Sequence, residues 1–232
     1  MERVAAAKNT STRELRLVPS EPRPLSVPRA AKCGLVCGDA RELPLPQSEK
    51  RVNFFDILEQ RRSKLPSTAL ATSDLARLLW HSARTTGLAR DSVGIDRGER
   101  PYPSAGGLYE GQLLVVDGDA VWLYDGIHHA LRAVTVPPEL VFAFKDELSA
   151  FSARDATALV VVAHACTLDL AYENATSLLW RDAGGQLNTI HLVASAMGLP
   201  SKQLGILGFD LVKGLSSTCG NLIAAGVMIV GN

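Results

Sequence analysis

The chain has 232 residues, 47% of them hydrophobic, and its 24 basic residues balance 24 acidic ones. This length suits one domain, or one domain with an extension, and allows a sizeable core. Zero net charge gives no reason to expect nucleic acid or a membrane surface as a partner, so a bound anion would need a local site.

The chain carries no targeting or membrane-spanning signal. The N-terminus, MERVAAAKNTSTRELRL, has no long apolar segment of the kind that secretory signals contain. The longest apolar runs, ALVVVAHA and LIAAGVMIVG, have the length of strands, whereas a membrane span needs about 20 residues. We therefore expect a soluble, cytoplasmic protein.

The four cysteines are Cys33, Cys37, Cys166 and Cys219. They are too few and too scattered to form a disulfide framework in a chain of this length. The first two form a CxxxC pattern, which is neither the CxxC of a zinc knuckle nor that of a redox pair. We expect incidental thiols in a reducing compartment and no metal site.

Residues 1–50 hold half of the chain's 12 prolines, with PSEPRPLSVPRA at their centre. Proline at this density prevents helix formation and most sheet pairing. This segment is predicted to be an extended arm that either is disordered or docks on a partner, and the sequence leaves both possibilities open. Residues 51–232 are predicted to form the globular domain.

The first half of this domain is predicted to contain two helices and a hairpin. The first helix starts at Phe54, places Phe54, Ile57 and Leu58 on one face and ends before Pro66. The second covers ATSDLARLLWHSART, capped by Thr72 or Ser73. The hairpin covers residues 111–134 around an Asp-Gly turn, and HALRAV adds a third short strand.

The second half is predicted to alternate helices with buried strands. A proline opens a short helix at PPELVFAF, and ATALVVVAHA is apolar on both faces, as expected of a central strand. A long helix follows over SLLWRDAGGQLNTIHLVASAMGLP, closing on Gly198, before the final strand IAAGVMIVG. Its inward residues are Leu187, Ile190, Val193, Ala194 and Met197. The order predicts an α+β fold with a mostly antiparallel sheet carrying helices.

Three short motifs are candidates for ligand contacts. Arg61, Arg62 and Ser63 (RRS) end the first helix, where two guanidiniums and a hydroxyl could hold a phosphate. PSAGG, residues 103–107, bares its backbone for close approach to a flat ligand. GILGFD, residues 205–210, bares it again at Gly208. Taken singly, the first is also typical of a solvated charge cluster and the second of a surface turn.

Together, these motifs resemble the FMN-dependent nitroreductase superfamily and, within it, the SagB-type (SagB/ThcOx) dehydrogenases. The resemblance covers residues 54–231 and includes PSAGGLY before VWLYDGIHHAL, and RDAGGQLNTIHLVASAMGL. It implies a nitroreductase-like α+β fold, a homodimer or a heterodimer with a related subunit, and FMN at the subunit interface.

The resemblance also implies a role for each matching residue. The phosphate and ribityl end of FMN would contact Arg61, Arg62, Ser63 and Lys202. The isoalloxazine would lie along Pro103, Ser104, Ala105 and Gly106, with Leu207 and Gly208 near its N5. The catalytic residue would be Tyr172.

The implied activity is oxidation of a peptide-derived substrate, with azoline to azole as the model, by hydride transfer to flavin N5. A partner such as a cyclodehydratase would bring the peptide, and the arm is a candidate docking element. Three positions depart from the family pattern: Ala171 replaces the lysine of a Lys-Tyr pair, Gly185 replaces a histidine, and Leu65 replaces a basic residue. These leave two alternatives open: an NAD(P)H-dependent nitroreductase-like or cyclodipeptide-oxidase-like enzyme, and a non-catalytic scaffold subunit.

The remaining histidines and two tryptophans are expected to be structural. His128 and His129 are adjacent, so in a strand they would face opposite sides, which favours a structural role over a metal pair. His164 is expected in the core, whereas His191 lies within reach of the flavin site on a face that the sequence leaves open. Trp80 and Trp180 are expected in the core or at a dimer contact.

Overall fold

The computed structural model describes residues 22–25, 35, 37–92, 96–151, 153–164, 168–169, 171–219 and 222–232. Cys33 and Cys166 lie outside these residues. One antiparallel sheet of seven strands organises the fold. Its strands are, in spatial order, β10 (Ser201–Leu204), β11 (Leu222–Val230), β8 (Thr157–His164), β5 (Gly111–Asp117), β6 (Ala120–Asp125), β7 (Ala130–Ala133) and β2 (Ala40–Glu42).

The centre of the sheet is the strand that the sequence predicts to be central. All eight residues of β8 are buried, because β11 and β5 flank it and helices cover both of its faces. The hairpin is also confirmed: β5 and β6 pair through Asp117 and Ala120, and Gly118 adopts φ +59° in the turn. The HALRAV segment provides β7, as predicted.

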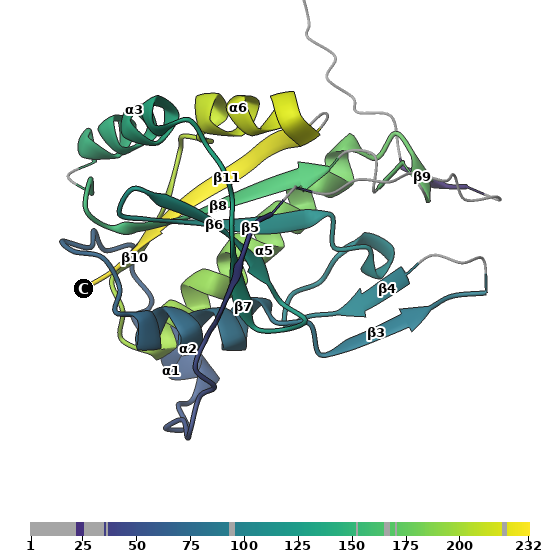
Figure 1. The fold of residues 1–232 in the computed structure, drawn as a ribbon. Helices are drawn as coiled ribbons and strands as arrows, with labels where there is room; N and C mark the ends of the chain where they lie inside the picture. The colour runs from purple at the N-terminus through teal and green to yellow at the C-terminus, as the bar shows by residue number, and fades with distance from the viewer. Residues whose placement is uncertain are drawn as a thin grey trace, which may run out of the picture.

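Helices cover the sheet on both faces, which gives two apolar cores (Figure 1). One face packs against α2 (Thr72–Ala83) and α5 (Thr176–Ala196), and the other against α3 (Pro138–Ser149) and α6 (Phe209–Cys219). Of the residues expected to face inward on α5, Leu187, Ile190 and Ala194 are buried, and Val193 and Met197 are partly buried. The α+β fold is confirmed.

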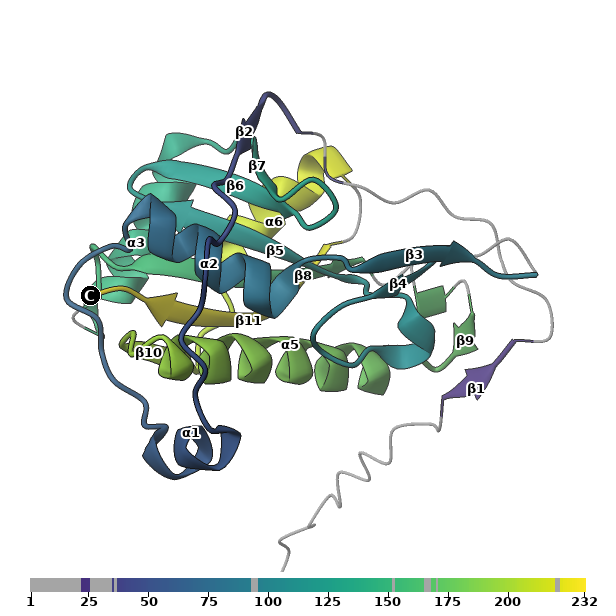
Figure 2. The same ribbon diagram turned by 90° about the horizontal axis from the view of Figure 1, so that it is seen from below.

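The first helix, α1 (Phe54–Gln60), lies outside these two layers, beside α5 (Figure 2). Asn53 caps it by accepting a hydrogen bond from the backbone N–H of Phe55 at 2.9 Å. None of its residues is buried, and Phe54 and Phe55 are 55% and 71% exposed. The apolar face predicted for this helix is therefore mostly exposed, with only Ile57 half-buried.

The predicted side-chain cap of α2 is wrong. Ala71 occupies the N-cap position and makes no side-chain cap bond. Thr72 is already inside the helix, where its hydroxyl accepts a hydrogen bond from Arg41 at 3.1 Å. The contact with the strand β2 thus occupies the hydroxyl that the sequence suggests as a cap.

Several elements escape prediction because each is short or lacks a clear apolar period. The strands β3 (Gly87–Arg90) and β4 (Asp96–Glu99) form a hairpin that projects from the body, and most of their residues are exposed (Figure 2). The 3₁₀ turn η1 covers Ala105–Gly107. The segment between α5 and β11, where the sequence suggests only the GILGFD motif, contributes β10 and α6.

Parts of the proline-rich arm contact the globular domain. The strand β1 (Arg23–Pro24) pairs with β9 (Tyr172–Glu173), and β2 adds the last strand to the sheet. Beyond β2, Leu43 is buried and Glu49 binds Arg77 through two hydrogen bonds of 2.8 and 2.7 Å. Docking of the arm on a second protein stays a prediction.

Among the described residues, none of the helices is both long enough and apolar enough to cross a membrane.

Candidate functional site

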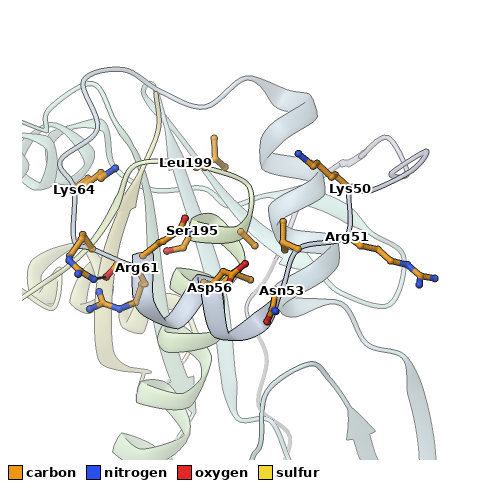
Figure 3. Close-up of a pocket in the computed structure, with 14 residues that line it drawn as sticks. Lys50, Arg51, Asn53, Asp56, Arg61, Lys64, Ser195 and Leu199 are labelled. Carbon is orange, nitrogen blue, oxygen red and sulfur yellow. Dashed lines mark hydrogen bonds between the residues drawn. The ribbon is translucent and has the colours of Figure 1, made fainter.

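A basic surface cavity of about 460 Å³ lies where α1 meets the C-terminal end of α5. Its walls are residues 50–53, α1 with the residues that follow it, and residues 195–199. Figure 3 shows Lys64 and Arg61 on one side and Lys50 on the other, with Asp56 and Ser195 between them. The segment after α1 is held to β10, where the Lys64 backbone N–H donates to the Ser201 carbonyl at 3.0 Å.

The cavity has an excess of positive charge. Five basic residues and one acidic residue line it. Within the described part of the chain none of the five forms an ion pair. Unpaired cations at one concave surface favour an anion, and guanidiniums suit phosphate in particular. The basic residues are Lys50, Arg51, Arg61, Arg62 and Lys64.

A buried histidine holds Arg61 in place. The Arg61 guanidinium lies 2.9 Å from His191 Nε2, and His191 Nδ1 lies 2.9 Å from the Ser201 hydroxyl. A guanidinium can only donate, so Nε2 accepts and Nδ1 carries the ring proton. Burial, together with the Arg61 charge, lowers the pKa of His191. The ring is thus kept neutral, and it faces Arg61 and Ser201.

The other residues expected at the phosphate end take different positions. Arg62 folds back over the end of α1, where it donates to the carbonyls of Glu59 and Arg61 at 2.8 Å each. Ser63 is exposed, and Lys202 lies half-buried on β10; neither lines the cavity. Of the four residues, Arg61 and Arg62 are thus at the basic cavity.

The PSAGG loop is fixed to α5 by one carboxylate. Asp182 accepts a hydrogen bond from the Ser104 hydroxyl at 2.7 Å and another from the Ala105 backbone N–H at 2.6 Å. The Ser104 oxygen in turn accepts one from the Tyr109 backbone N–H at 3.0 Å. Asp182 on α5 therefore holds this loop in its shape.

Gly106 and Tyr172 lie against each other. Gly106 adopts φ +59°, and a Cβ at this position would stand 2.8 Å from the Tyr172 hydroxyl and 2.8 Å from Arg97 Nη1. Arg97 donates to the Gly106 carbonyl and also pairs with Asp91 at 2.8 Å. A bare residue is needed here because two side chains from other elements contact the loop backbone.

A buried glutamate beside this loop was missed in the sequence. Glu110 is 3% exposed, and its carboxylate lies 3.5 Å from the Ser104 hydroxyl. Burial, followed by the nearby charge of Asp182, raises the pKa of Glu110 to about 7. In the sequence, the only indication of this site was one acidic residue between the PSAGG loop and the apolar strand β5.

The third motif lies on the opposite side of the sheet from α2. Gly208 is buried with φ +66°, and a Cβ there would stand 3.0 Å from the Phe144 ring on α3. Leu207 is 38% exposed and lines an apolar cavity of about 320 Å³, which Trp180 and Phe209 also line.

The structure brings some of the predicted site residues together and keeps others apart. Tyr172, the PSAGG loop and Asp182 form one cluster, whereas Arg61 with His191 forms a second and Leu207 lines a third surface. Neither the basic cavity nor the apolar cavity is lined by residues of more than one of the three motifs.

The other histidines are accounted for by the fold. His128 and His129 lie in a turn rather than in a strand, contrary to expectation: His128 Nδ1 lies 2.8 Å from Asp125, and the buried His129 lies 2.9 Å from the Tyr124 hydroxyl. His164 is buried in β8, 3.2 Å from the Gln112 side-chain oxygen, as expected of a core histidine.

Comparison with known proteins adds information on the fold. No protein-family model matches the chain, and no curated protein matches it. Solved structures do match. A candidate nitroreductase from Ralstonia eutropha JMP134 aligns with a TM-score of 0.56 and 18% identity, over 91% of this chain and 98% of that chain.

Two further structures are similar over most of the chain. One belongs to the E. coli microcin synthetase McbBCD, solved with truncated pro-MccB17 bound; its TM-score is 0.51, at 19% identity over 83% of this chain and 77% of that chain. The other is a candidate nitroreductase from Anabaena variabilis ATCC 29413, with a TM-score of 0.55 and 19% identity over 81% of this chain and 40% of that chain. This chain therefore has the nitroreductase-like α+β fold.

Proposed function

We propose that this protein is an FMN-dependent oxidoreductase of the SagB type, which dehydrogenates a peptide-derived substrate, azoline to azole, within a modification complex. The observation that carries the proposal is the basic cavity beside α1, with Arg61 held by the neutral His191. The fold likeness to nitroreductases supports a flavin, and the likeness to a chain of the microcin synthetase complex supports a peptide substrate.

The residues present fit the cofactor. Arg61, Lys64 and Lys50 surround the cavity with unpaired positive charge, as a phosphate requires. The PSAGG loop offers backbone rather than bulky side chains, as a flat ring requires, and Asp182 keeps its shape. Ser63, Lys202, Leu207 and Gly208 stay assigned to FMN through the family resemblance.

Both half-sites lie along α5. Asp182 on α5 binds the PSAGG loop, and His191 on the same helix binds Arg61. The two residues are nine positions apart, which corresponds to about 14 Å along the helix axis. A dimer with the cofactor at its interface would let the phosphate half of one subunit meet the ring half of the other. The partner is a second copy or a related subunit.

Bound FMN supplies a hydride acceptor. The reaction also needs a base for the proton that leaves the substrate. We assign this role to Tyr172, whose hydroxyl lies beside the backbone of Gly106 and which would take the proton as its phenolate. The family's lysine is missing at Ala171. Arg97, which also pairs with Asp91, is a cation beside this hydroxyl: a Cβ at Gly106 would stand 2.8 Å from both Arg97 Nη1 and the Tyr172 hydroxyl.

Cofactor binding is tested by titrating the purified protein with FMN and with riboflavin, which lacks the phosphate. We expect a yellow complex with FMN and at least tenfold weaker binding of riboflavin. Arg61→Gln should weaken FMN about tenfold or more and leave riboflavin unchanged, because it removes a phosphate contact. Arg154→Gln, on another surface, is the matched control. A protein that stays colourless with FMN would overturn the proposal.

The reaction is tested with the FMN complex, its cyclodehydratase partner and an azoline peptide. We expect azole formation that falls strongly in Tyr172→Phe and in Arg97→Met, with FMN still bound. Rapid bleaching of the flavin by NAD(P)H, without a peptide requirement, would instead identify a nitroreductase-like enzyme. An unchanged rate in Tyr172→Phe would remove the tyrosine from the mechanism and favour a scaffold role.

A further inference from the structure

A second polar cavity is lined by residues outside the proposed cofactor site. It measures about 200 Å³ and lies where the end of α2, the strands β5 and β6 and the helix α5 come together. It shares no lining residue with the basic cavity beside α1. Its volume has room for several water-sized groups, since one water occupies about 30 Å³ in the liquid.

Three residues that line this cavity carry buried polar atoms without a hydrogen-bond partner among the described residues. They are Gln186, through both its side-chain oxygen and nitrogen, Arg100, through Nε, and Thr85, through its hydroxyl. Gln186 is only 1% exposed. Buried polar atoms in folded proteins nearly always have partners. Three such residues from separate parts of the chain at one cavity therefore indicate a bound polar group.

The charge of the cavity identifies the sign of that group. Asp125 lines it but is compensated, because His128 at 2.8 Å and Arg132 at 2.7 Å bind it and lower its pKa to about 2. Arg100 makes no ion pair with a described residue. Its contacts are neutral: the Tyr102 hydroxyl at 2.8 Å and the Tyr109 ring at 4.9 Å. The uncompensated charge at the cavity is thus positive.

We propose that this cavity binds a small carboxylate anion. The Arg100 Nε–H, the Gln186 amide N–H and the Thr85 hydroxyl supply three donors, and a carboxylate has two oxygens that accept them. The apolar wall of Leu113 and Leu123 suits a short alkyl group. The proposal does not depend on FMN, because none of these residues belongs to the cofactor site.

The test uses the full chain and acetate, with acetamide as an uncharged molecule of the same shape. Line broadening of ¹³C-labelled acetate is titrated at constant ionic strength in a buffer free of other carboxylates. We expect acetate to bind at least tenfold more tightly than acetamide. Thr85→Val should weaken acetate about tenfold, since it removes one hydrogen bond to a charged group. Gln186→Leu should abolish binding, and the exposed Gln47→Leu should change nothing.

Circular dichroism shows whether each variant is folded. If Gln186→Leu fails to fold, Thr85→Val carries the test, because valine keeps the shape of threonine. Binding of acetate and acetamide with equal affinity, or acetate affinity unchanged in folded Thr85→Val, would refute the carboxylate site. Failure of the wild type to bind acetate at all would mean that the cavity holds water only, which also refutes it.

Discussion

The carboxylate of Asp182 accepts the Ser104 hydroxyl at 2.7 Å, which ties the PSAGG loop to α5 across 78 positions of sequence. The same oxygen accepts the Ala105 backbone N–H. We expect Asp182→Ala to lower the free energy of unfolding by about 1–3 kcal/mol, because two hydrogen bonds to a charged acceptor are lost. Urea unfolding measures this. Asn188→Ala, an exposed polar position on the same helix, should be nearly neutral, and an equal loss in both variants would argue against the role of Asp182.

Glu110 makes stability depend on pH. Its pKa is raised from 4.5 to about 7, so the folded protein holds this proton more tightly than the unfolded chain does. The contribution is complete below pH 4.5 and is lost as pH rises to about 7, by up to roughly 3 kcal/mol. Glu110→Gln should therefore flatten the loss of stability between these values. The exposed Glu139→Gln is the control and should keep the wild-type slope.

His191 acts in the opposite direction. Burial lowers its pKa, so the unfolded chain takes up a proton that the folded protein refuses. Stability from this group is lost as pH falls below the unfolded value of about 6.5. We expect His191→Gln to lose less stability than the wild type between pH 7.5 and 5.5, measured by urea unfolding at each pH. The exposed Gln47→Leu, which changes no titratable group, should retain the wild-type loss, and identical profiles for His191→Gln and the wild type would contradict the prediction.

Gly208 is required by its backbone. Its φ of +66° disfavours any other residue, and a Cβ would stand 3.0 Å from the Phe144 ring. Gly208→Ala should lower the free energy of unfolding by about 1–3 kcal/mol. Gly205→Ala tests the same change three residues earlier, where nothing lies within 4 Å of the added atom. It should be nearly neutral, so a similar loss at both positions would show that strain is not the cause.

The contact between Glu49 and Arg77 holds the end of the arm on α2. Two hydrogen bonds lower the pKa of Glu49 to about 2, with Arg77 as the main cause. Its contribution is present above pH 4.5 and is lost as pH falls toward 2. Because the Arg77 side chain is 37% exposed, Glu49→Gln should cost less than about 1 kcal/mol at pH 7. The cost should shrink in high salt, and a salt-independent cost would point to packing instead.

Strong periodic patterns in the sequence determined most of the fold. The apolar run of β8, the Asp-Gly turn between β5 and β6 and the three-to-four spacing along α5 each predict one element without help from distant residues. The exposed strands β3 and β4 lack such a pattern, so their pairing was not predictable. No element was predicted for the segment that forms α6, because a short helix that contains Gly214 has only a weak periodic pattern.

The sequence by itself determined which residue types could contact a ligand: RRS, PSAGG and the glycine at 208. The tertiary structure decided which of them meet. It placed Tyr172 against Gly106, Asp182 beneath Ser104 and His191 behind Arg61, and it left Leu207 on a different surface. It also buried Glu110 and Gln186, which the sequence alone does not distinguish from exposed polar residues. The physical reason is that burial, and the partners that raise or lower a pKa, depend on contacts between segments far apart in the chain, whereas helix and strand patterns depend on near neighbours.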